Sequence, residues 1–316
     1  MLRVVFMGTP QFSVSALEAC HKHFKVVAVV TRPDQPAGRG QKLTPPPVKV
    51  CAEKLGLPIF QPIKLNTPEE IAKLKNLNAD AFVVVAYSQL LKREVLDIPS
   101  LGCFNIHASL LPHWRGAAPI QYSIWKGDSE TGITIMKMEE GLDSGPVLLQ
   151  KSIPILANDT SATLFEKLSP LGAELIVEAL EGYRDGKLKL LPQDHSKVTL
   201  SPKLSKELEW INLEISATEA DHQIRAFEPW PGSSILVHGE KLKIKEGRPR
   251  PELKGKKGEL YLEAGTLLLG LGQGCLELVA VQPEGKRAQN SSEYVNGLRG
   301  RGLSLPTQAS SGTVKK

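Results

Sequence analysis

The sequence predicts an α/β protein in which a doubly wound, mainly parallel sheet is followed by a small β-barrel. Two observations support this fold class. The first half of the chain alternates strongly apolar runs with segments of helical periodicity, whereas the second half consists of short β-rich pieces separated by turn residues. The length of 316 residues also exceeds that of a usual single domain, so two domains are expected.

The strands of the first domain are predicted from contiguous apolar and β-branched residues, because strands in the middle of a covered sheet are buried on both faces. The first such run stops at a Gly-Thr-Pro turn and is followed by apolar residues on a helical spacing. We expect strands at residues 2–7, 25–30, 80–86, 102–107 and 132–138, and helices after residue 12, at 47–55 and at 162–180.

The second domain is predicted from a change of texture after a polar stretch that contains several prolines and lysines. Short β-rich pieces then occur at 234–237, 241–244, 258–261, 266–271 and 275–281. We therefore expect a catalytic domain over 1–189, a linker over 190–208, a barrel over 209–305 and a disordered tail over 306–316.

Residues 31–49 do not fit a simple α/β pattern, because they hold five prolines and two glycines between a predicted strand and a predicted helix. Connections of this length in compact domains are usually functional or disordered. The segment also carries Arg32, Arg39, Lys42 and Lys49. These charges indicate contact with phosphates, and the alternative is a mobile surface loop that has no partner.

The composition is that of a soluble globular protein, with 41% hydrophobic and 23% charged residues. There is no run of 18 apolar residues, and the apolar stretch at the start is too short for a signal peptide. A cytoplasmic protein without membrane contact is therefore expected. The four cysteines form no CxxC pair, which argues against a zinc site or a disulfide framework and favours buried or incidental thiols.

The positive charge is concentrated toward the C-terminus. The chain has a formal net charge of +5, and residues 241–316 contain nine lysines and five arginines against seven glutamates and no aspartate. A polyanionic partner is compatible with this distribution, and a solvated basic surface explains it equally well. The residues concerned include Lys241, Lys243, Lys245, Lys256, Lys257, Lys286 and Arg287.

Candidate catalytic groups lie where a predicted strand ends, because ligands of open α/β sheets bind outside the carboxyl ends of the strands. Asn105 and His107 are two residues apart on such a strand, so their side chains point to the same face. Asp143 lies in a glycine-bounded turn that follows the next strand. Taken singly, such a histidine is more often structural, and such an aspartate usually caps the local backbone.

Together these three residues suit acyl transfer to an amine. The carbonyl oxygen that is attacked becomes negative, the new ammonium loses a proton and the leaving nitrogen gains one. Asn105 can donate to the oxyanion, His107 can stabilise that charge or shuttle protons, and Asp143 can orient the ring and stabilise the imidazolium. Other site classes lack their motifs: GxGxxG, GxxxxGK[ST], HExxH and GxSxG are absent, and no metal-ligand spacing is present.

Three motifs strengthen this interpretation: Asn-Ile-His-Ala-Ser-Leu-Leu-Pro at 105–112, Trp-Arg-Gly-Ala-Ala-Pro-Ile-Gln at 114–121 and Gly-Leu-Asp-Ser-Gly at 141–145. In this order they resemble the signature of the folate-dependent formyltransferases. The resemblance implies a Rossmann-like domain, 10-formyltetrahydrofolate as co-substrate, no metal, and a catalytic set of Asn105, His107 and Asp143. It assigns binding of the donor to Ser109, Leu110, Leu111 and Pro112.

The chain is longer than the family members that act on small amines. Its segments 5–10, 31–40 and 225–231 resemble those of the members that formylate methionyl-tRNA for translation initiation, and the likeness runs from about residue 2 to about residue 300. It implies initiator methionyl-tRNA as partner, a loop that enters the acceptor stem, a C-terminal barrel of OB type that holds the tRNA, and a monomer. The predicted tRNA-binding residues are Arg39, Lys42, Lys206 and Lys286.

Three positions depart from the family pattern: His113 replaces the usual arginine, Ser88 a glycine and Ser144 a threonine. The sequence allows two other interpretations. One is a formyltransferase for a small amine, such as an amino sugar attached to a nucleotide. The other is an RNA-binding protein whose α/β domain has lost its chemistry, and the presence of Asn105, His107 and Asp143 argues against it.

Overall fold

The structure is a computed structural model that describes residues 1–38, 40 and 42–312. The chain divides into two compact units. Unit 1 comprises Met1–Pro119, Glu130–Pro154 and Phe165–Ser201, and unit 2 comprises Ile120–Ser129, Ile155–Leu164 and the chain from Pro202 onward.

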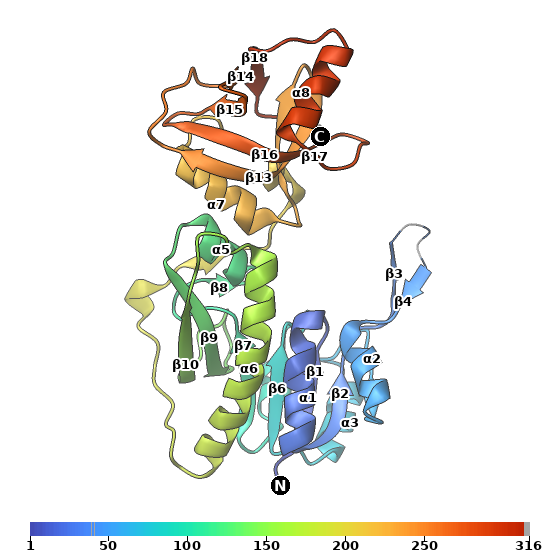
Figure 1. Cartoon of the computed structure of the whole chain (residues 1–316). Helices are drawn as coiled ribbons and strands as arrows, with labels where there is room; N and C mark the ends of the chain where they lie inside the picture. Colours follow the sequence, from blue (N-terminus) through green and yellow to red (C-terminus); the bar gives the residue numbers. More distant parts are fainter. Residues whose placement is uncertain (39, 41, 313–316) are drawn as a thin grey trace. The chain divides into compact units, whose positions relative to one another are not determined.

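Unit 1 is built on a seven-stranded sheet with the order β10-β9-β7-β6-β1-β2-β5 (Figure 1). Five neighbouring strands are parallel, and β9 and β10 are antiparallel additions at one edge. This confirms the predicted doubly wound, mainly parallel sheet. The strands are β1 (Arg3–Gly8), β2 (Lys25–Val30), β5 (Ile59–Phe60), β6 (Ala81–Val85), β7 (Gly102–His107), β9 (Glu130–Lys137) and β10 (Val147–Pro154).

The central strands are buried because their residues are apolar on both faces. On one face of the sheet, Val5 and Met7 of β1 pack in a cluster with alternate residues of β2 and β6. Val4 and Phe6, which point to the opposite face, are equally buried. In the sheet, β2 is the neighbour of β1 on one edge, whereas β6, which follows later in the chain, is its neighbour on the other edge. Such a reversal of strand order is where open α/β sheets form their ligand sites.

Helices α1 (Val14–His23) and α6 (Ser161–Arg184) lie on the same face of this sheet in Figure 1. The hydroxyl of Ser169 on α6 lies 3.1 Å from the hydroxyl of Ser15 on α1 and donates to the carbonyl oxygen of Phe12, just before α1, over 2.9 Å. The other helical segments that precede α6 are η1 (Gln11–Ser13), α2 (Pro47–Lys54), α3 (Pro68–Asn76), α4 (Arg93–Leu96) and α5 (Pro119–Trp125).

The proline-rich segment 31–49 contains a β-hairpin, which Figure 1 shows projecting from the rest of unit 1. Its arms are β3 (Gln35–Ala37) and β4 (Lys42–Thr44), which pair antiparallel. The ammonium group of Lys49 at the base of the hairpin forms an ion pair with Asp34 over 2.8 Å. The hydrogen bonds from Lys49 and Gln61 hold the pKa of Asp34 below its ordinary value. Lys49 thus fixes the base of the hairpin, and its contact with phosphates stays a prediction.

Part of the predicted linker is ordered within unit 1. Residues 193–201 include η2 (His195–Lys197) and β11 (Leu200–Ser201), and β11 pairs in parallel with β8 (Arg115–Gly116). Gln193, Thr199 and Ser201 form hydrogen bonds with backbone groups elsewhere in unit 1. Asp194 and Ser196 are exposed and form a hydrogen bond with each other. Composition alone does not distinguish such a segment from a solvated linker.

Unit 2 contains a closed barrel of six strands in the order β13-β12-β18-β14-β15-β16, with β13 and β16 pairing to close it. This confirms the predicted small β-barrel. A capping box formed by Ser216 and Glu219 begins α7, which packs against β13. The elements are η3 (Lys206–Glu209), α7 (Ala217–Phe227), β12 (Ser233–Val237), β13 (Glu240–Arg250), β14 (Glu259–Glu263), β15 (Thr266–Gly270), β16 (Cys275–Pro283), β17 (Gln289–Asn290), α8 (Ser291–Gly300) and β18 (Thr307–Ser310).

The prediction of a disordered tail over 306–316 is wrong for its first part. Thr307–Ser310 forms β18, which pairs with β12 on one side and with β14 on the other. Ala309 is only 1% exposed. The segment is ordered because its backbone completes the barrel, a contribution that its polar sequence does not reveal.

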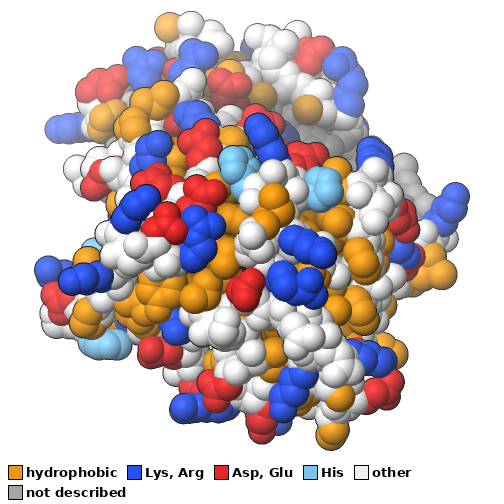
Figure 2. Space-filling view, turned by 90° about the horizontal axis from the view of Figure 1, so that it is seen from below, with side chains coloured by type: hydrophobic (Ala, Val, Ile, Leu, Met, Phe, Trp, Pro, Cys, Tyr) orange, Lys and Arg blue, Asp and Glu red, His pale blue; other side chains and the backbone are white. Residues whose placement is uncertain are grey.

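No helix in the part of the chain that the structure describes is long and apolar enough to cross a membrane. Figure 2 shows Lys and Arg side chains interspersed with Asp and Glu on the face that it draws. Several basic residues of unit 2 are likewise paired with acids. Lys241 contacts Glu209, Lys245 contacts Glu228, and Lys257 forms an ion pair with Glu214 over 2.6 Å.

Candidate active site

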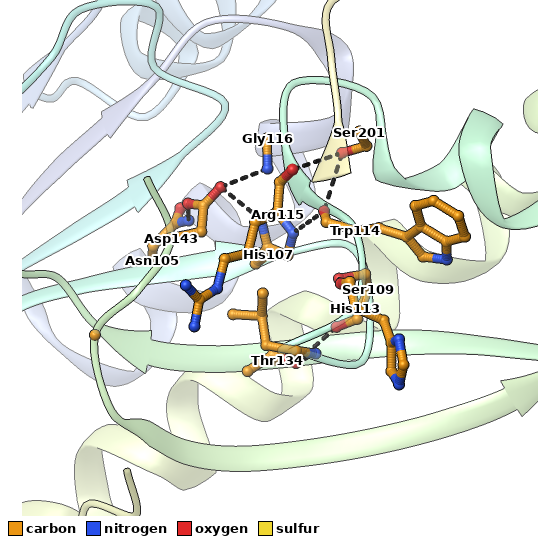
Figure 3. Close-up of polar contacts among 12 residues, drawn as sticks. Asn105, His107, Ser109, His113, Trp114, Arg115, Gly116, Thr134, Asp143 and Ser201 are labelled. Carbon is orange, nitrogen blue, oxygen red and sulfur yellow. Dashed lines mark hydrogen bonds and ion pairs between the residues drawn. The ribbon is translucent and has the colours of Figure 1, made fainter. Parts of the chain in front are cut away.

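The candidate site lies at the carboxyl end of β7 (Figure 3). Asn105 and His107 are the alternate residues of this strand that contact Asp143, which confirms that they share a face. The strand lies between β6 and β9, so its end is held from both sides. The His107 side chain is 5% exposed, whereas Asn105 is only partly buried.

Asp143 is the group that the other polar atoms surround. The Asn105 amide nitrogen lies 3.5 Å from its Oδ1, and Nδ1 of His107 lies 3.7 Å from its Oδ2. The shortest contact is the backbone N–H of Gly116, which donates to Oδ2 over 2.9 Å. The carboxylate is thus held firmly by the backbone and contacts the two side chains of β7 more loosely.

His107 has a second partner on the other side of its ring. Its Nε2 lies 3.0 Å from the carbonyl oxygen of Trp114, while Figure 3 shows the Trp114 indole directed away from the ring. A carbonyl oxygen can only accept a hydrogen bond, so Nε2 carries a proton. Nδ1 is therefore the ring nitrogen that faces Asp143 and is free of the Trp114 contact.

Two glycines allow these contacts. Gly116 has a φ of +124°, and a Cβ atom there would come within 2.6 Å of the carbonyl oxygen of Ser201. At Gly145 a Cβ atom would lie 1.9 Å from the carbonyl oxygen of Lys137. Asp143, two residues before Gly145, has a φ of +46°, a conformation that aspartate tolerates better than most residues. The loop that presents the carboxylate therefore depends on Gly145, and the backbone N–H that the carboxylate accepts from depends on Gly116.

Two family models match this chain. Formyl transferase matches residues 2–180, and formyl transferase, C-terminal domain, matches residues 203–299. The chain belongs to the formyl transferase family. The first model contains the end of β7 and the Asp143 loop, so the candidate site lies in the part of the chain that defines the family.

Solved structures share the fold. HypX from Aquifex aeolicus in complex with tetrahydrofolic acid is 19% identical with a TM-score of 0.61 over 96% of this chain, which spans only 48% of the HypX chain. WlaRD, a sugar 3N-formyl transferase in the presence of dTDP and 5-N-formyl-THF, is 20% identical with a TM-score of 0.67 over 91% of this chain and 99% of its own.

The N-formyltransferase from Helicobacter canadensis, in complex with folinic acid and dTDP-3-aminofucose, is 21% identical with a TM-score of 0.67. The match covers 90% of this chain and the whole of that one. At these identities the three structures show a common fold, and the match covers at least 90% of this chain in each case.

The predicted donor-binding residues of this formyl transferase family member form a tightly hydrogen-bonded turn after β7. Thr134 on β9 donates to the carbonyl oxygen of Ser109 over 2.6 Å and accepts from the N–H of Leu111 over 3.1 Å. The Ser109 hydroxyl donates to the carbonyl oxygen of His113 over 2.5 Å and is fully buried. Ser109 therefore shapes the turn, and Leu110 and Pro112 are its partly exposed members.

The predicted tRNA-binding residues fall in different places. Arg39 lies outside the described residues. Lys42 is exposed on β4 of the hairpin in unit 1. Lys206 at the start of η3 and Lys286 between β16 and β17 are exposed in unit 2. The side chain of His113, the departure from the family pattern, is exposed as well.

Sequence reasoning missed the backbone partners of the site. The N–H of Gly116 and the carbonyl oxygen of Trp114 carry no side-chain signal, although both lie in the quoted motif 114–121. It also missed the buried Arg115, whose guanidinium contacts Gln193. Among the described residues, no group of three or more His, Cys, Asp or Glu side chains could hold a metal ion.

Proposed function

We propose that the protein transfers the formyl group of 10-formyltetrahydrofolate to the α-amino group of methionine on initiator methionyl-tRNA. The observation that carries this proposal is the meeting of Asn105, His107 and Asp143 at the end of β7 in a member of the formyl transferase family. The product would be formylmethionyl-tRNA for translation initiation.

Asn105 suits the charge that forms on the formyl oxygen. When the amine attacks the formyl carbon, a C–N bond forms and the carbonyl oxygen becomes negative. One N–H of the Asn105 amide points to Asp143, which orients the group. Because the amide group is planar, this contact also fixes the direction of the second N–H, which can donate to the oxyanion.

Asp143 and His107 suit the movement of the proton. The attacking nitrogen becomes an ammonium and must lose a proton, and N10 of the folate must gain one when its bond to the formyl carbon breaks. The Asp143 carboxylate can accept the first proton and pass it to the folate nitrogen through His107 Nδ1, 3.7 Å away. Nε2 keeps its proton and donates it in a hydrogen bond to the Trp114 carbonyl oxygen, so a direct hydrogen bond from Nε2 to the oxyanion is not part of this route.

The choice of a folate donor is supported by the neighbours, since their names record tetrahydrofolic acid, 5-N-formyl-THF and folinic acid as bound molecules. In this chain the rigid turn 109–112 next to the catalytic groups is the proposed contact for the donor, with Leu110 and Pro112 as the exposed surfaces. Ser109 and Leu111 would support them from within.

The choice of a tRNA acceptor rests on charge and on the hairpin. An exposed hairpin that carries Lys42 and an excess of basic residues after position 241 are suited to phosphates. A second candidate acceptor is a nucleotide-linked amino sugar. One neighbour that covers 91% of this chain is named as a sugar 3N-formyl transferase, and an N-formyltransferase that covers 90% of this chain is in complex with dTDP-3-aminofucose.

The deciding experiment compares acceptors. Formyl transfer from 10-formyltetrahydrofolate is measured with methionyl initiator tRNA, free methionine and a dTDP-linked amino sugar, each at 50 and 200 mM salt. We expect transfer to the charged tRNA alone, with kcat/KM falling at least tenfold at the higher salt. If the protein instead formylates only the amino sugar, at a rate that does not depend on salt, the tRNA acceptor is wrong and the proposed formyl transfer at this site still holds.

The His107→Ala variant separates chemistry from binding. Because His107 is proposed to move the proton, we expect formyl transfer to fall at least 100-fold while the affinity for methionyl-tRNA changes less than twofold. His113→Ala, which alters an exposed histidine beside the same turn, is the control and should retain most of the activity. An unchanged rate in His107→Ala would exclude this mechanism.

A further inference from the structure

The residues between the two family matches make direct contact with the candidate site. The 193–201 segment follows the first match, which ends at residue 180, and precedes the second, which begins at residue 203. It belongs to unit 1 together with the site. Its contacts fall on the two backbone segments that flank the His107 ring, residues 114–116 and 143–145.

Gln193 holds the Asp143 loop. This side chain is 7% exposed, and its amide nitrogen donates to the carbonyl oxygens of Asp143 over 2.8 Å and of Gly145 over 2.7 Å. Its amide oxygen accepts from Nη2 and Nε of the buried Arg115 over 2.7 and 3.1 Å. One glutamine thus joins the backbone that carries the carboxylate to the residue that follows Trp114.

Thr199 and Ser201 hold the carbonyl partner of His107. The hydroxyl of Ser201, which is fully buried, donates to the carbonyl oxygen of Trp114 over 2.9 Å. The Trp114 N–H donates to the Thr199 hydroxyl over 2.9 Å, and the Arg115 N–H donates to the Thr199 carbonyl oxygen, also over 2.9 Å. Figure 3 shows Ser201 and His107 directed at the same carbonyl oxygen.

We propose that the 193–201 segment is a positioning element of the active site, in which Gln193 fixes Asp143 and Ser201 fixes the Trp114 carbonyl oxygen on opposite sides of His107. This inference rests on the proposed function of the three side chains. Neither Gln193 nor Ser201 contacts the His107 ring itself, so both act through the groups that they hold. Precise placement of reacting groups matters because errors of about 1 Å can cost about 100-fold in rate.

Two substitutions isolate the two contacts. Gln193→Glu keeps the size of the side chain and an oxygen for Arg115, but it loses both donations to the carbonyl oxygens of Asp143 and Gly145. Ser201→Ala removes the hydroxyl that lies 2.9 Å from the carbonyl oxygen of Trp114 and 3.3 Å from that of Arg115. For each we expect kcat to fall about 10- to 100-fold while KM for the donor and for the acceptor changes less than threefold.

The chain offers matched controls for both. Gln223 is a buried glutamine of unit 2 whose amide nitrogen also donates to two carbonyl oxygens, those of Leu208 and Trp210. Gln223→Glu therefore makes the same loss within unit 2. Ser196→Ala removes an exposed hydroxyl from the same segment, where it donates to Asp194. Both controls should keep kcat within threefold of the wild type.

A second measurement needs no substrate. In the full-length protein labelled with 15N, the ring nitrogens of His107 report their neighbours, and the His107→Ala variant assigns them. We expect these resonances to shift in Gln193→Glu and Ser201→Ala and to stay unchanged in the two controls. If the wild type formylates no acceptor, the proposed function fails and the ring resonances still decide the positioning role.

The proposal is overturned by either of two results. One is unchanged His107 ring resonances in both test variants, with kcat within threefold of the wild type where the wild type is active. The other is an equal loss of kcat in Gln223→Glu, which would trace the effect to general destabilisation.

Discussion

The role of Asp143 can be tested with a substitution that keeps its shape. Asp143→Asn retains an oxygen that can accept from the Gly116 N–H, so the loop should keep its conformation. The neutral amide cannot take a proton from the ammonium, and it offers His107 no negative charge. We expect kcat to fall about 100- to 1,000-fold and the melting temperature to change by less than about 2 °C.

Steady-state kinetics and calorimetry on the same preparation measure both quantities. Glu139→Gln, an acidic position shortly before the loop, is the matched loss of one negative charge. If Asp143→Asn retained more than a tenth of the wild-type kcat, Asp143 would not be the proton acceptor.

The cysteines are predicted to be unreactive in the folded protein. All four are buried and free, and burial raises the pKa of Cys20 and of Cys103 to about 12. Because only the thiolate attacks a disulfide reagent, these two thiols should not react at pH 8 within an hour. Titration with dithiobis(nitrobenzoate), before and after unfolding in guanidinium, measures this. Rapid reaction of Cys20 or Cys103 in the native protein would contradict the burial.

At this scale the sequence identifies side chains and misses backbone groups. Asn105 and His107 could be paired because a strand repeats every two residues, and Asp143 because its glycines mark a turn. The Trp114 carbonyl oxygen could not be predicted, because every residue has one and only the fold decides where it points. The role of Gln193 could not be predicted either, because a glutamine in a polar stretch is usually a solvated surface residue.

Among the elements, β18 provides a prediction about stability. A chain that ends at Leu305 lacks Thr307–Ser310, so β12 and β14 lose the strand that lies between them. Unpaired backbone groups and the lost burial of Ala309 should lower the free energy of unfolding by about 2–4 kcal/mol. Denaturation by urea, followed by the fluorescence of Trp210 and the other tryptophans, measures the change.

The matched control is a chain that ends at Gly312, which keeps β18 and all described residues. It should unfold at the wild-type urea concentration. Equal stability of the two truncated proteins would show that β18 contributes nothing to the barrel.

Elements with a strong apolar pattern could be predicted, and polar ones could not. The runs at 2–7, 25–30 and 80–86 became the buried centre of the sheet, because burial on both faces requires such residues. Strands β11 and β18 are short and polar, and they exist because neighbouring strands offer unpaired backbone groups to them. Their polar composition is equally compatible with a loop, and sequences as short as these contain no periodicity that indicates a strand.

For the whole molecule, the charge distribution predicts how the proposed tRNA binding depends on salt. If Lys42 of unit 1 and Lys286 of unit 2 each contact one phosphate, each lysine-to-alanine substitution should reduce the slope of log K against log salt by about 1. Lys257, which is paired with Glu214, should have a smaller effect when it is replaced by alanine. Filter binding of methionyl-tRNA between 50 and 300 mM salt measures these slopes. Equal slopes for the wild type and both variants would remove Lys42 and Lys286 from the binding surface.

The contacts of residues 193–201 also determine where this chain can be recombined with a relative. The first family match ends at residue 180, and a chimera joined there would combine one protein's Asp143 loop with another protein's glutamine and serine. A junction placed after Ser201 keeps these partners in the same parental sequence. Exchanges of the barrel that aim to change the acceptor should therefore retain the first 201 residues as one block.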